Sequence, residues 1–223
     1  MQNSVELIGY YGSDITHAQS AWTSTVRDLS EEKLNRVDKL LASLAEAGHH
    51  TPFEKSSLHF LVNVDQATHI HLLKHRISVS INGESARYKE LKEDKFYLPV
   101  DWINIKYQGS DTERIEGIGN KDWYRILEDY TKMGNVLYHQ AIKDLTPILG
   151  KKRAKESARF FKTINSQITL DIMFNWRSFV HFLRLRNDEA AQLEVRELAK
   201  TMLDLVKNIE GNPFQHTINA FKL

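Results

Sequence analysis

The chain has 223 residues, of which 41% are hydrophobic and 26% are charged, and its formal net charge at pH 7 is +1. This composition is typical of a globular protein, and the length suffices for one large domain with a substantial core. The balanced charge argues against nucleic acid or an anionic membrane as a partner attracted by the overall field. Cysteine is absent, which excludes disulfides, zinc–thiolate sites and any mechanism with a cysteine nucleophile.

The chain carries no pattern of a targeting or membrane-spanning segment. No apolar run approaches the length of a bilayer span, and the N-terminus lacks a cationic stretch followed by an apolar one. We therefore expect a cytoplasmic protein without a membrane partner. Repeats and low-complexity linkers are also absent, so we predict a single domain over residues 1–223.

The first predicted element is a helix that begins at Ser30 and ends at Gly48. Ser30 is a favourable N-cap, and Gly48 stands where a C-terminal cap belongs. Between them apolar residues recur at helical spacing. These residues are Leu34, Val37, Leu40, Leu41 and Leu44.

A strand and a short helix are predicted next. Alternating residues over 57–62 place Leu58, Phe60 and Val62 on one face of a strand. Asp65 follows as the expected cap of a short helix that leads into a basic stretch. A long polar connection is then predicted over about 95–120.

The second half of the chain predicts one strand among helices. Helical patterns lie over 121–145, 176–185 and 189–209, and alternation over 168–174 predicts the strand. Pro147 is expected to end the first of these helices. An apolar stripe on the last helix is assigned to the core rather than to a cofactor. The stripe consists of Leu193, Leu198, Met202, Leu205 and Ile209.

The stretch 74–88, which reads KHRISVSINGESARY, is the most informative for function. It sets Lys74, Arg76 and Arg87 among small polar side chains. Permanent cations next to hydroxyl and amide donors suit phosphate and carboxylate groups. We favour a small anionic ligand over the alternative of a solvated basic loop.

The segment 48–56, which reads GHHTPFEKS, allows two interpretations. His49, His50, Glu54 and the nearby His59 are possible metal ligands, and a metal-dependent hydrolase would use them. Their spacing fits no zinc signature, however, and no helical pair of histidines. We favour a turn in which the side chains of Thr51 and Glu54 bind backbone amides, with no metal.

The segment 175–192 carries arginines among aromatic residues. In a helix, Arg177 and Arg184 share a face, and His181 lies one turn from Arg177. Arg186 comes close to the predicted helix end. Interleaved aromatic residues indicate a partly buried site that holds charge.

In these three segments the chain resembles the flavin-dependent thymidylate synthases. That family has Arg-His-Arg followed by Ser-x-Asn-x-x-Ser-x-Arg-Tyr, and here Lys74-His75-Arg76 and Ser80 to Tyr88 correspond. The upstream His-x-Thr-Pro-Phe-Glu motif is matched by 49–54, and the downstream Asn-x-Arg-Ser motif by 175–178. Order and spacing hold from about Gly12 to Phe214.

The chain also departs from the family pattern. Lys74 replaces the first arginine of the triplet and lacks its bidentate geometry. One extra residue separates Arg76 from Ser80, so the loop must bulge or shift register. His71 stands where the family commonly has glutamine, and His181 where it commonly has asparagine. A divergent flavin- and nucleotide-binding homologue with weak or altered activity therefore stays open.

The resemblance implies two sets of ligand-binding residues. The FAD-binding set is Ser24, Thr51, Glu54, Lys74, His75, Arg76, Asn175, Arg177 and His181. The set implied for dUMP is His71, Glu84, Ser85, Arg87, Arg159 and Arg186. Arg87 and Arg159 would bind the phosphate, and Arg186 would stabilise negative charge on a uracil carbonyl oxygen.

The resemblance further implies an α+β fold with a central mixed or antiparallel sheet flanked by helices, assembled as a homotetramer. The implied reaction converts dUMP to dTMP with methylenetetrahydrofolate as carbon donor and NADPH-reduced FAD as hydride donor. His75 would contact the reacting ligands. Ser85 could replace the missing cysteine nucleophile, but no general base lies beside it, so we assign it a positioning role.

A nucleic-acid-binding module is the remaining alternative. It would centre on residues 69–95, where six lysines and arginines face four carboxylates. The resulting excess of two positive charges is small for a surface that follows a phosphate backbone. We therefore expect no nucleic-acid partner.

Overall fold

A computed structural model describes residues 2–25, 29–109, 118 and 121–223. The chain divides into two compact units. The sheet unit contains Ser4–Asn63, Ile70–Asn82 and Thr169–Leu223, and the α5 unit contains Met1–Asn3, Val64–His69 and Gly83–Ile168. No helix among the described residues is long and apolar enough to cross a membrane.

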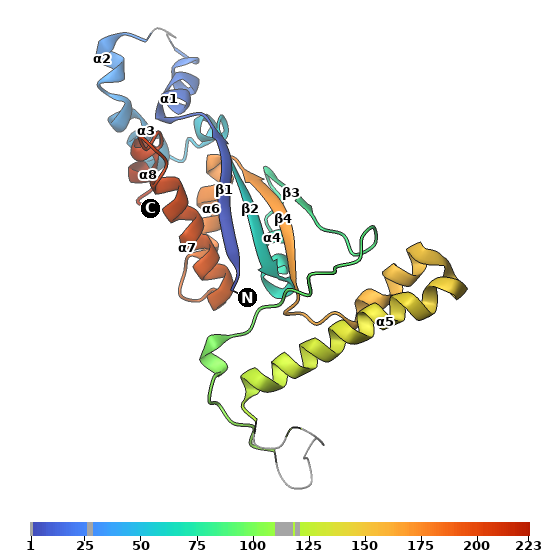
Figure 1. The fold of residues 1–223 in the computed structure, drawn as a ribbon. Coiled ribbons are helices and arrows are strands. Elements are labelled where there is room, and N and C mark those ends of the chain that lie inside the picture. Colours follow the sequence, from blue (N-terminus) through green and yellow to red (C-terminus); the bar gives the residue numbers. More distant parts are fainter. Residues whose placement is uncertain (1, 26–28, 110–117, 119–120) are drawn as a thin grey trace. The chain divides into compact units, whose positions relative to one another are not determined.

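Four strands form one sheet in the order β1-β2-β4-β3 (Figure 1). Their bounds are Ser4–Tyr11 for β1, Ser57–Asp65 for β2, Val79–Gly83 for β3 and Gln167–Phe174 for β4. Strands β1 and β2 are antiparallel, with an irregular register between Leu7 and Gly9. The strands predicted over 57–62 and 168–174 are confirmed. β1 was missed, and its residues are all exposed or half-buried, as is usual for an edge strand.

The helices of the sheet unit cover this sheet and its ends. Their bounds are Asp14–Trp22 (α1), Glu31–Leu34 (α2), Val37–Glu46 (α3), Trp176–Arg186 (α6), Leu193–Lys207 (α7) and Gln215–Ala220 (α8), with a 3₁₀ turn at Thr51–Glu54 (η1). In Figure 1, α7 runs alongside β1. The predicted α+β class with helices flanking the sheet is confirmed.

The core of the sheet unit is rich in aromatic residues. Leu58, Phe60 and Val62 of β2 are buried, as their alternation predicted. The ring of Phe60 stacks on Phe179 of α6, with centroids 5.7 Å apart. Phe182, one turn farther along α6, lies 5.2 Å from Phe174 of β4. Alternation in the strands and helical spacing in α6 therefore combine into one apolar interface.

Helix boundaries near Ser30 and in α7 differ from the prediction. The helix expected over 30–48 is broken into α2 and α3, and the side chain of Ser30 makes no capping hydrogen bond. Leu34 is consequently left exposed. In α7, Leu193 was wrongly assigned to the core because the helix begins only at that residue and leaves it 38% exposed. The side chains buried along α7 are Val195, Leu198, Ala199, Met202, Leu203 and Val206.

The α5 unit is built around helix α5, Trp123–Ala158. Its other elements are α4 (Gln66–Leu73), which crosses from one unit to the other, and short 3₁₀ turns at Val100–Trp102 (η2) and Arg159–Phe161 (η3). The predicted cap of α4 is confirmed, since the backbone N–H of Thr68 donates to Asp65 Oδ1 at 2.9 Å. Of the predicted polar connection over 95–120, residues 110–117, 119 and 120 lie outside the described residues.

The prediction that Pro147 ends the helix was wrong. Helical structure continues past Pro147, and the break lies at Gly150, whose φ of 77° is in the left-handed region. After this glycine the chain turns back along the preceding helix (Figure 1). Tyr138, Ile142 and Ala158 are then buried against one another. A proline costs a helix one hydrogen bond, whereas a reversal of the chain needs the conformational freedom of glycine.

A buried chain of hydrogen bonds joins three segments of the sheet unit. The His17 ring lies between Ser56 Oγ, at 2.7 Å from Nε2, and Thr217 Oγ1, at 2.9 Å from Nδ1. The Thr217 hydroxyl donates to Asp14 Oδ1 at 2.6 Å. Thr217 therefore accepts from Nδ1–H, which leaves His17 Nε2 to accept from Ser56. Burial lowers the pKa of His17 to about 4, so the ring is neutral.

His17 makes stability depend on pH. Because its pKa is lower in the folded chain than in the unfolded one, the unfolded state binds more protons between about pH 6.5 and 4. Stability is therefore full above pH 6.5 and is lost as the pH falls, by on the order of 3 kcal/mol from this residue. Urea unfolding at several pH values should give a shallower pH dependence for His17→Gln than for the parent. An equal pH dependence in both would contradict this assignment.

Candidate active site

A cavity of about 510 Å³ lies in the sheet unit where three segments meet. One segment is the turn around η1, the second follows α4, and the third is the exposed face of α6. The lining residues are His50, Glu54, Lys74, His75, Arg76, Ile77, Ser78, Val79, Arg177, Ser178, Val180, His181, Arg184, Leu185 and Arg186. Parts of the three sequence segments predicted to carry the chemistry thus line one cavity.

His75 is the most buried titratable residue of this cavity. The backbone N–H of His75 bonds to the carbonyl of Leu72, which continues the last turn of α4 and turns the side chain inward. Its ring packs edge-on against Phe182, with centroids 5.1 Å apart. The same aromatic face of α6 that contacts the sheet therefore also holds this histidine.

A hydrogen bond between Arg186 and His75 fixes the state of the imidazole. Arg186 Nε donates to His75 Nε2 at 3.0 Å. A guanidinium can only donate, so Nε2 carries a lone pair and the proton resides on Nδ1. Burial, together with the nearby charges of Arg186, His181 and His71, lowers the pKa of His75 to about 4. The cavity thus contains a neutral imidazole among cations.

The cations of the cavity differ in their partners. Arg177 Nη1 donates to Glu54 Oε1 at 2.6 Å, which ties α6 to the η1 turn. Among the described residues, Lys74 and Arg76 have no carboxylate within ion-pairing distance. Arg184 lies over the ring of Phe221, 5.8 Å from its centroid. Cations without carboxylate partners that surround a cavity favour an anionic ligand.

The extra residue between Arg76 and Ser80 produces a bulge. Ser78 has a φ of 53°, which is unusual for a residue other than glycine. The carbonyl of Ile77 accepts a hydrogen bond from Ser178 Oγ at 2.7 Å. Sequence reasoning singled out the stretch 74–88, which contains Ile77 and Ser78, but assigned neither of these two residues to a ligand.

Four residues of the sheet unit that were predicted to bind ligands lie outside this cavity. Ser24 is exposed beyond α1, and its hydroxyl donates to the carbonyl of Ala21. Thr51 is exposed in η1. Asn175 caps α6 by accepting from the N–H of Ser178 at 2.9 Å. The ring of His71 contacts Gln192 Oε1 at 2.9 Å.

The remaining predicted residues belong to the α5 unit, near the end of α5. Arg87 donates from Nε to Glu156 Oε1 at 3.0 Å, and this contact lowers the pKa of Glu156. Arg159 follows one helical turn later and is exposed. Glu84 pairs with Lys89, and the carbonyl of Ser85 accepts from the N–H of Lys89. Arg87 and Arg159 thus both lie near the end of α5.

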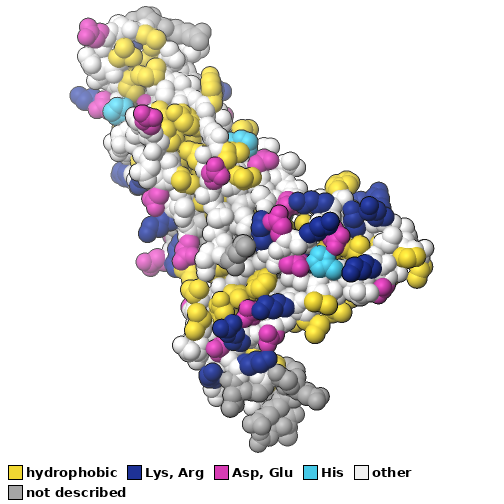
Figure 2. All heavy atoms as spheres, viewed as in Figure 1, with side chains coloured by type: hydrophobic (Ala, Val, Ile, Leu, Met, Phe, Trp, Pro, Cys, Tyr) yellow, Lys and Arg dark blue, Asp and Glu magenta, His cyan; other side chains and the backbone are white. Residues whose placement is uncertain are grey.

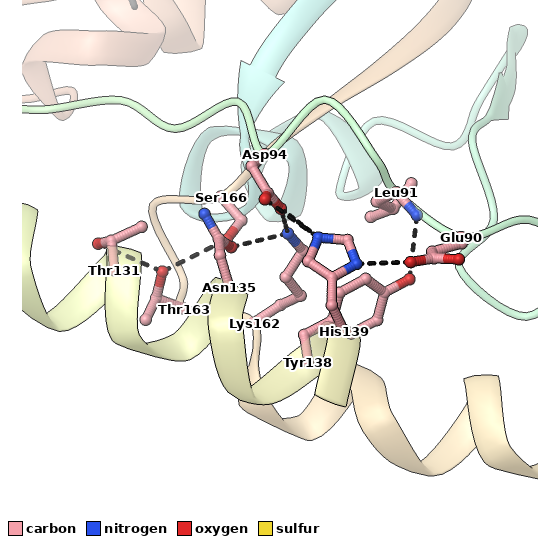
Figure 3. Close-up of polar contacts among 10 residues, drawn as sticks. All are labelled: Glu90, Leu91, Asp94, Thr131, Asn135, Tyr138, His139, Lys162, Thr163 and Ser166. Carbon is pink, nitrogen blue, oxygen red and sulfur yellow. Dashed lines mark hydrogen bonds and ion pairs between the residues drawn. The ribbon is translucent and has the colours of Figure 1, made fainter. Parts of the chain in front are cut away.

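A polar network anchors the loop that carries Ser85 and Arg87 (Figure 3). The ring of His139 on α5 lies between Glu90 Oε1, at 2.5 Å, and Asp94 Oδ2, at 3.0 Å. Lys162, whose side chain is only 4% exposed, donates to Asp94 Oδ1 at 2.8 Å. The Lys162 ammonium also lies 4.7 Å from the centroid of the Tyr138 ring. These paired charges hold residues 90–94 against α5.

The alternatives gain little from the structure. No group of three histidine or carboxylate side chains in the described part of the chain could hold a metal ion. Instead, His59 contacts Asp171, and His50 contacts the carbonyl of Ala45. On the face drawn in Figure 2, Lys and Arg side chains over α5 alternate with Asp and Glu. This mixture is unlike a surface that follows nucleic acid.

The comparisons with known proteins agree on one family. The family model described as thymidylate synthase complementing protein matches residues 6–210. Flavin-dependent thymidylate synthases of Rickettsia bellii and Pseudothermotoga lettingae are each 31% identical, over 91% and 92% of this chain and 71% and 85% of their own lengths. The enzyme of Ehrlichia ruminantium (strain Gardel) is 28% identical over 91% of this chain, which spans 66% of that relative's length.

Two solved structures have a similar fold over nearly the whole chain. Both are of the UMP/dUMP methylase PolB from Streptomyces cacaoi, one bound with 5-Br UMP and the other with 5-Br dUMP. The TM-scores are 0.74 and 0.72 at 25% identity, covering 99% of this chain and 94% and 95% of those chains.

The pKa of His75 should respond to Arg186. In Arg186→Met the positive charge is lost while the burial remains, so the pKa should rise but stay below 6.5. Titration of the imidazole proton signals by NMR measures it directly. Arg184→Met is the matched control, since Arg184 lines the same cavity without a hydrogen bond to His75. An unchanged His75 pKa in Arg186→Met would show that the contact does not control the imidazole.

Proposed function

This chain belongs to the thymidylate synthase complementing protein family, and on that premise we propose that it catalyses the reductive methylation of dUMP to dTMP. Methylenetetrahydrofolate is the proposed carbon donor, and FAD reduced by NADPH is the proposed hydride donor. The chain would act as a homotetramer and without a cysteine nucleophile. The alternative is a divergent flavin- and nucleotide-binding homologue with weak or altered activity.

The observation that supports the proposal is the composition of the cavity in the sheet unit. Lys74, Arg76 and Arg177 come from two of the family's motifs and line one space of about 510 Å³. Lys74 and Arg76 have no carboxylate partner among the described residues, which suits the diphosphate of FAD. The donor set therefore fits this cofactor, whose bound flavin would supply the redox chemistry.

The protein's own contribution is orientation and charge. The neutral ring of His75 offers its Nδ1–H as a donor, since Nε2 is taken by Arg186. Arg186 uses Nε for that contact and keeps its terminal Nη groups for a uracil carbonyl oxygen. Positive charge held there stabilises an oxyanion that develops during the reaction. The buried position of His75 and its contact with Phe182 fix this geometry before any ligand binds.

The phosphate of dUMP is assigned to the end of α5. Arg87 and Arg159 supply the cations, and Ser85 supplies a hydroxyl donor within the loop anchored on α5. Glu156 holds the Arg87 guanidinium at 3.0 Å and so orients it for a second, anionic partner. Glu84 and His71 complete the proposed nucleotide set.

UMP is a second candidate substrate. It is favoured by the fold similarity to PolB, a UMP/dUMP methylase whose structures contain analogues of both nucleotides. The two substrates differ by the ribose 2′-hydroxyl. Parallel assays with dUMP and UMP distinguish them, because the proposal requires a higher kcat/KM for dUMP.

The experiment that tests the proposal starts with the visible absorption spectrum of the purified protein. Flavin bands that bleach on anaerobic addition of NADPH, followed by dTMP formation with dUMP and methylenetetrahydrofolate, are the expected results. A protein that fails to bind added FAD would overturn the proposal. Bound FAD without product from either nucleotide would leave the non-catalytic homologue as the correct interpretation.

Ser85 is expected to position dUMP rather than to attack it. Ser85→Ala should therefore lower activity by about tenfold, the loss of one hydrogen bond, without abolishing it. Steady-state kinetics with dUMP measures the effect. Ser80→Ala is the control, since Ser80 is an exposed serine of β3 that we assign no ligand. Complete loss of turnover with intact dUMP binding would instead identify Ser85 as a nucleophile.

A further inference from the structure

We propose that Ile77 is a ligand-binding residue whose side chain packs against the planar ring of the anionic nucleotide bound in the cavity. This inference rests on the proposed function, because it requires that the cavity binds FAD or dUMP. It concerns a residue of the insertion between Arg76 and Ser80, where this chain departs from the spacing of its family motif.

Ile77 is the most exposed large hydrophobic residue among those described, at 86%. A single exposed isoleucine is common on protein surfaces and needs no explanation by itself. Ile77 differs because it lines the same cavity as His75 and Arg186. Its apolar side chain is therefore exposed to solvent at the point where a ligand is expected. A ligand ring that packed on it would remove this apolar surface from water and so bind more tightly.

The backbone around Ile77 is fixed by two features. Ser78 adopts the left-handed conformation, with a φ of 53°, which costs a serine roughly 1 kcal/mol. On the other side, the carbonyl of Ile77 accepts from Ser178 Oγ at 2.7 Å. Ser178 is buried and belongs to the first turn of α6, where its N–H is bound by Asn175. The bulge therefore holds Ile77 outward instead of leaving it free to fold onto the core.

The surroundings of Ile77 define the chemistry of the ligand. Lys74 and Arg76 lie within three residues before it in the chain, and Arg177 and Arg186 line the same cavity. The cavity also has apolar side chains of its own, namely Val79, Val180 and Leu185. A ligand with an anionic group and a flat apolar ring satisfies both kinds of surface. Nucleotides have this combination, and FAD and dUMP are the ones that the proposed function assigns to residues of this cavity.

The test compares ligand affinity in Ile77→Ala and in the parent. FAD binding is followed by flavin fluorescence, and dUMP binding to the FAD-loaded protein by calorimetry. The methyl and methylene groups that the bound ligand would cover are removed in Ile77→Ala. The affinity for the ligand that packs on Ile77 should therefore fall by roughly tenfold. Ile77→Leu, which conserves volume, should retain most of the affinity.

Ile148→Ala is the matched control. Ile148 is an isoleucine of similar exposure, at 79%, and it does not line this cavity. Its substitution should leave both affinities unchanged. Neither alanine variant should shift the thermal midpoint, because both side chains are mostly in water in the folded chain. A loss of affinity in Ile77→Ala at an unchanged midpoint is then an effect on the ligand and not on folding.

The bulge is tested separately at Ser78. Ser78→Gly keeps access to a positive φ, whereas Ser78→Val makes it costly because of the branched side chain. Ser78→Val should therefore lower the affinity for the same ligand more than Ser78→Gly does. Equal affinities in these two variants would show that the bulge does not hold Ile77 in place.

The outcomes separate the inference from the proposed function. Weaker binding of FAD, of dUMP or of both in Ile77→Ala supports the inference and identifies the ring that covers Ile77. Affinities for both ligands equal to those of the parent would overturn the inference while leaving the proposed function intact. A parent protein that binds neither nucleotide would overturn the proposed function, and the inference with it.

Discussion

The packing of α6 against the sheet is the constraint on which the candidate site depends. Phe179 and Phe182 of this helix are buried against Phe60 and Phe174 of the strands. Since residues three and four apart share a helix face, burial of this aromatic face directs the other face outward. Arg177, Arg184 and their neighbours on α6 can therefore line a cavity.

This arrangement also explains why the cavity contains a neutral histidine beside so many cations. Phe182 and the burial of His75 disfavour the imidazolium, and Arg186 disfavours it further through its charge. The same arginine supplies the hydrogen bond that selects the tautomer. Apolar packing and electrostatics thus both favour the neutral imidazole. This ring can donate a hydrogen bond to a bound ligand without transferring a proton to it.

The errors of the sequence-based prediction come from interactions between distant segments. Alternation identified β2 and β4 because one face of each strand is buried, whereas β1 alternates only between exposed and half-buried positions. Pro147 was expected to end α5, but the packing of Tyr138 and Ile142 against Ala158 depends on a reversal at Gly150. Local propensity indicates where a helix is weak, and tertiary packing decides where it breaks.

The sequence by itself determined the strands β2 and β4, the aromatic face of α6 and the motif residues, because each of these is a matter of residue type and short-range spacing. The α+β class was implied by the family resemblance that the motif residues carry. Only the tertiary structure decided which side chains share the cavity and which, such as Asn175, serve the backbone instead. The contact between Arg186 and His75 joins residues 111 positions apart, and that between Ser178 and Ile77 joins residues 101 apart. Spacing along the chain carries no information about such distances, which are fixed by how the helices and strands pack.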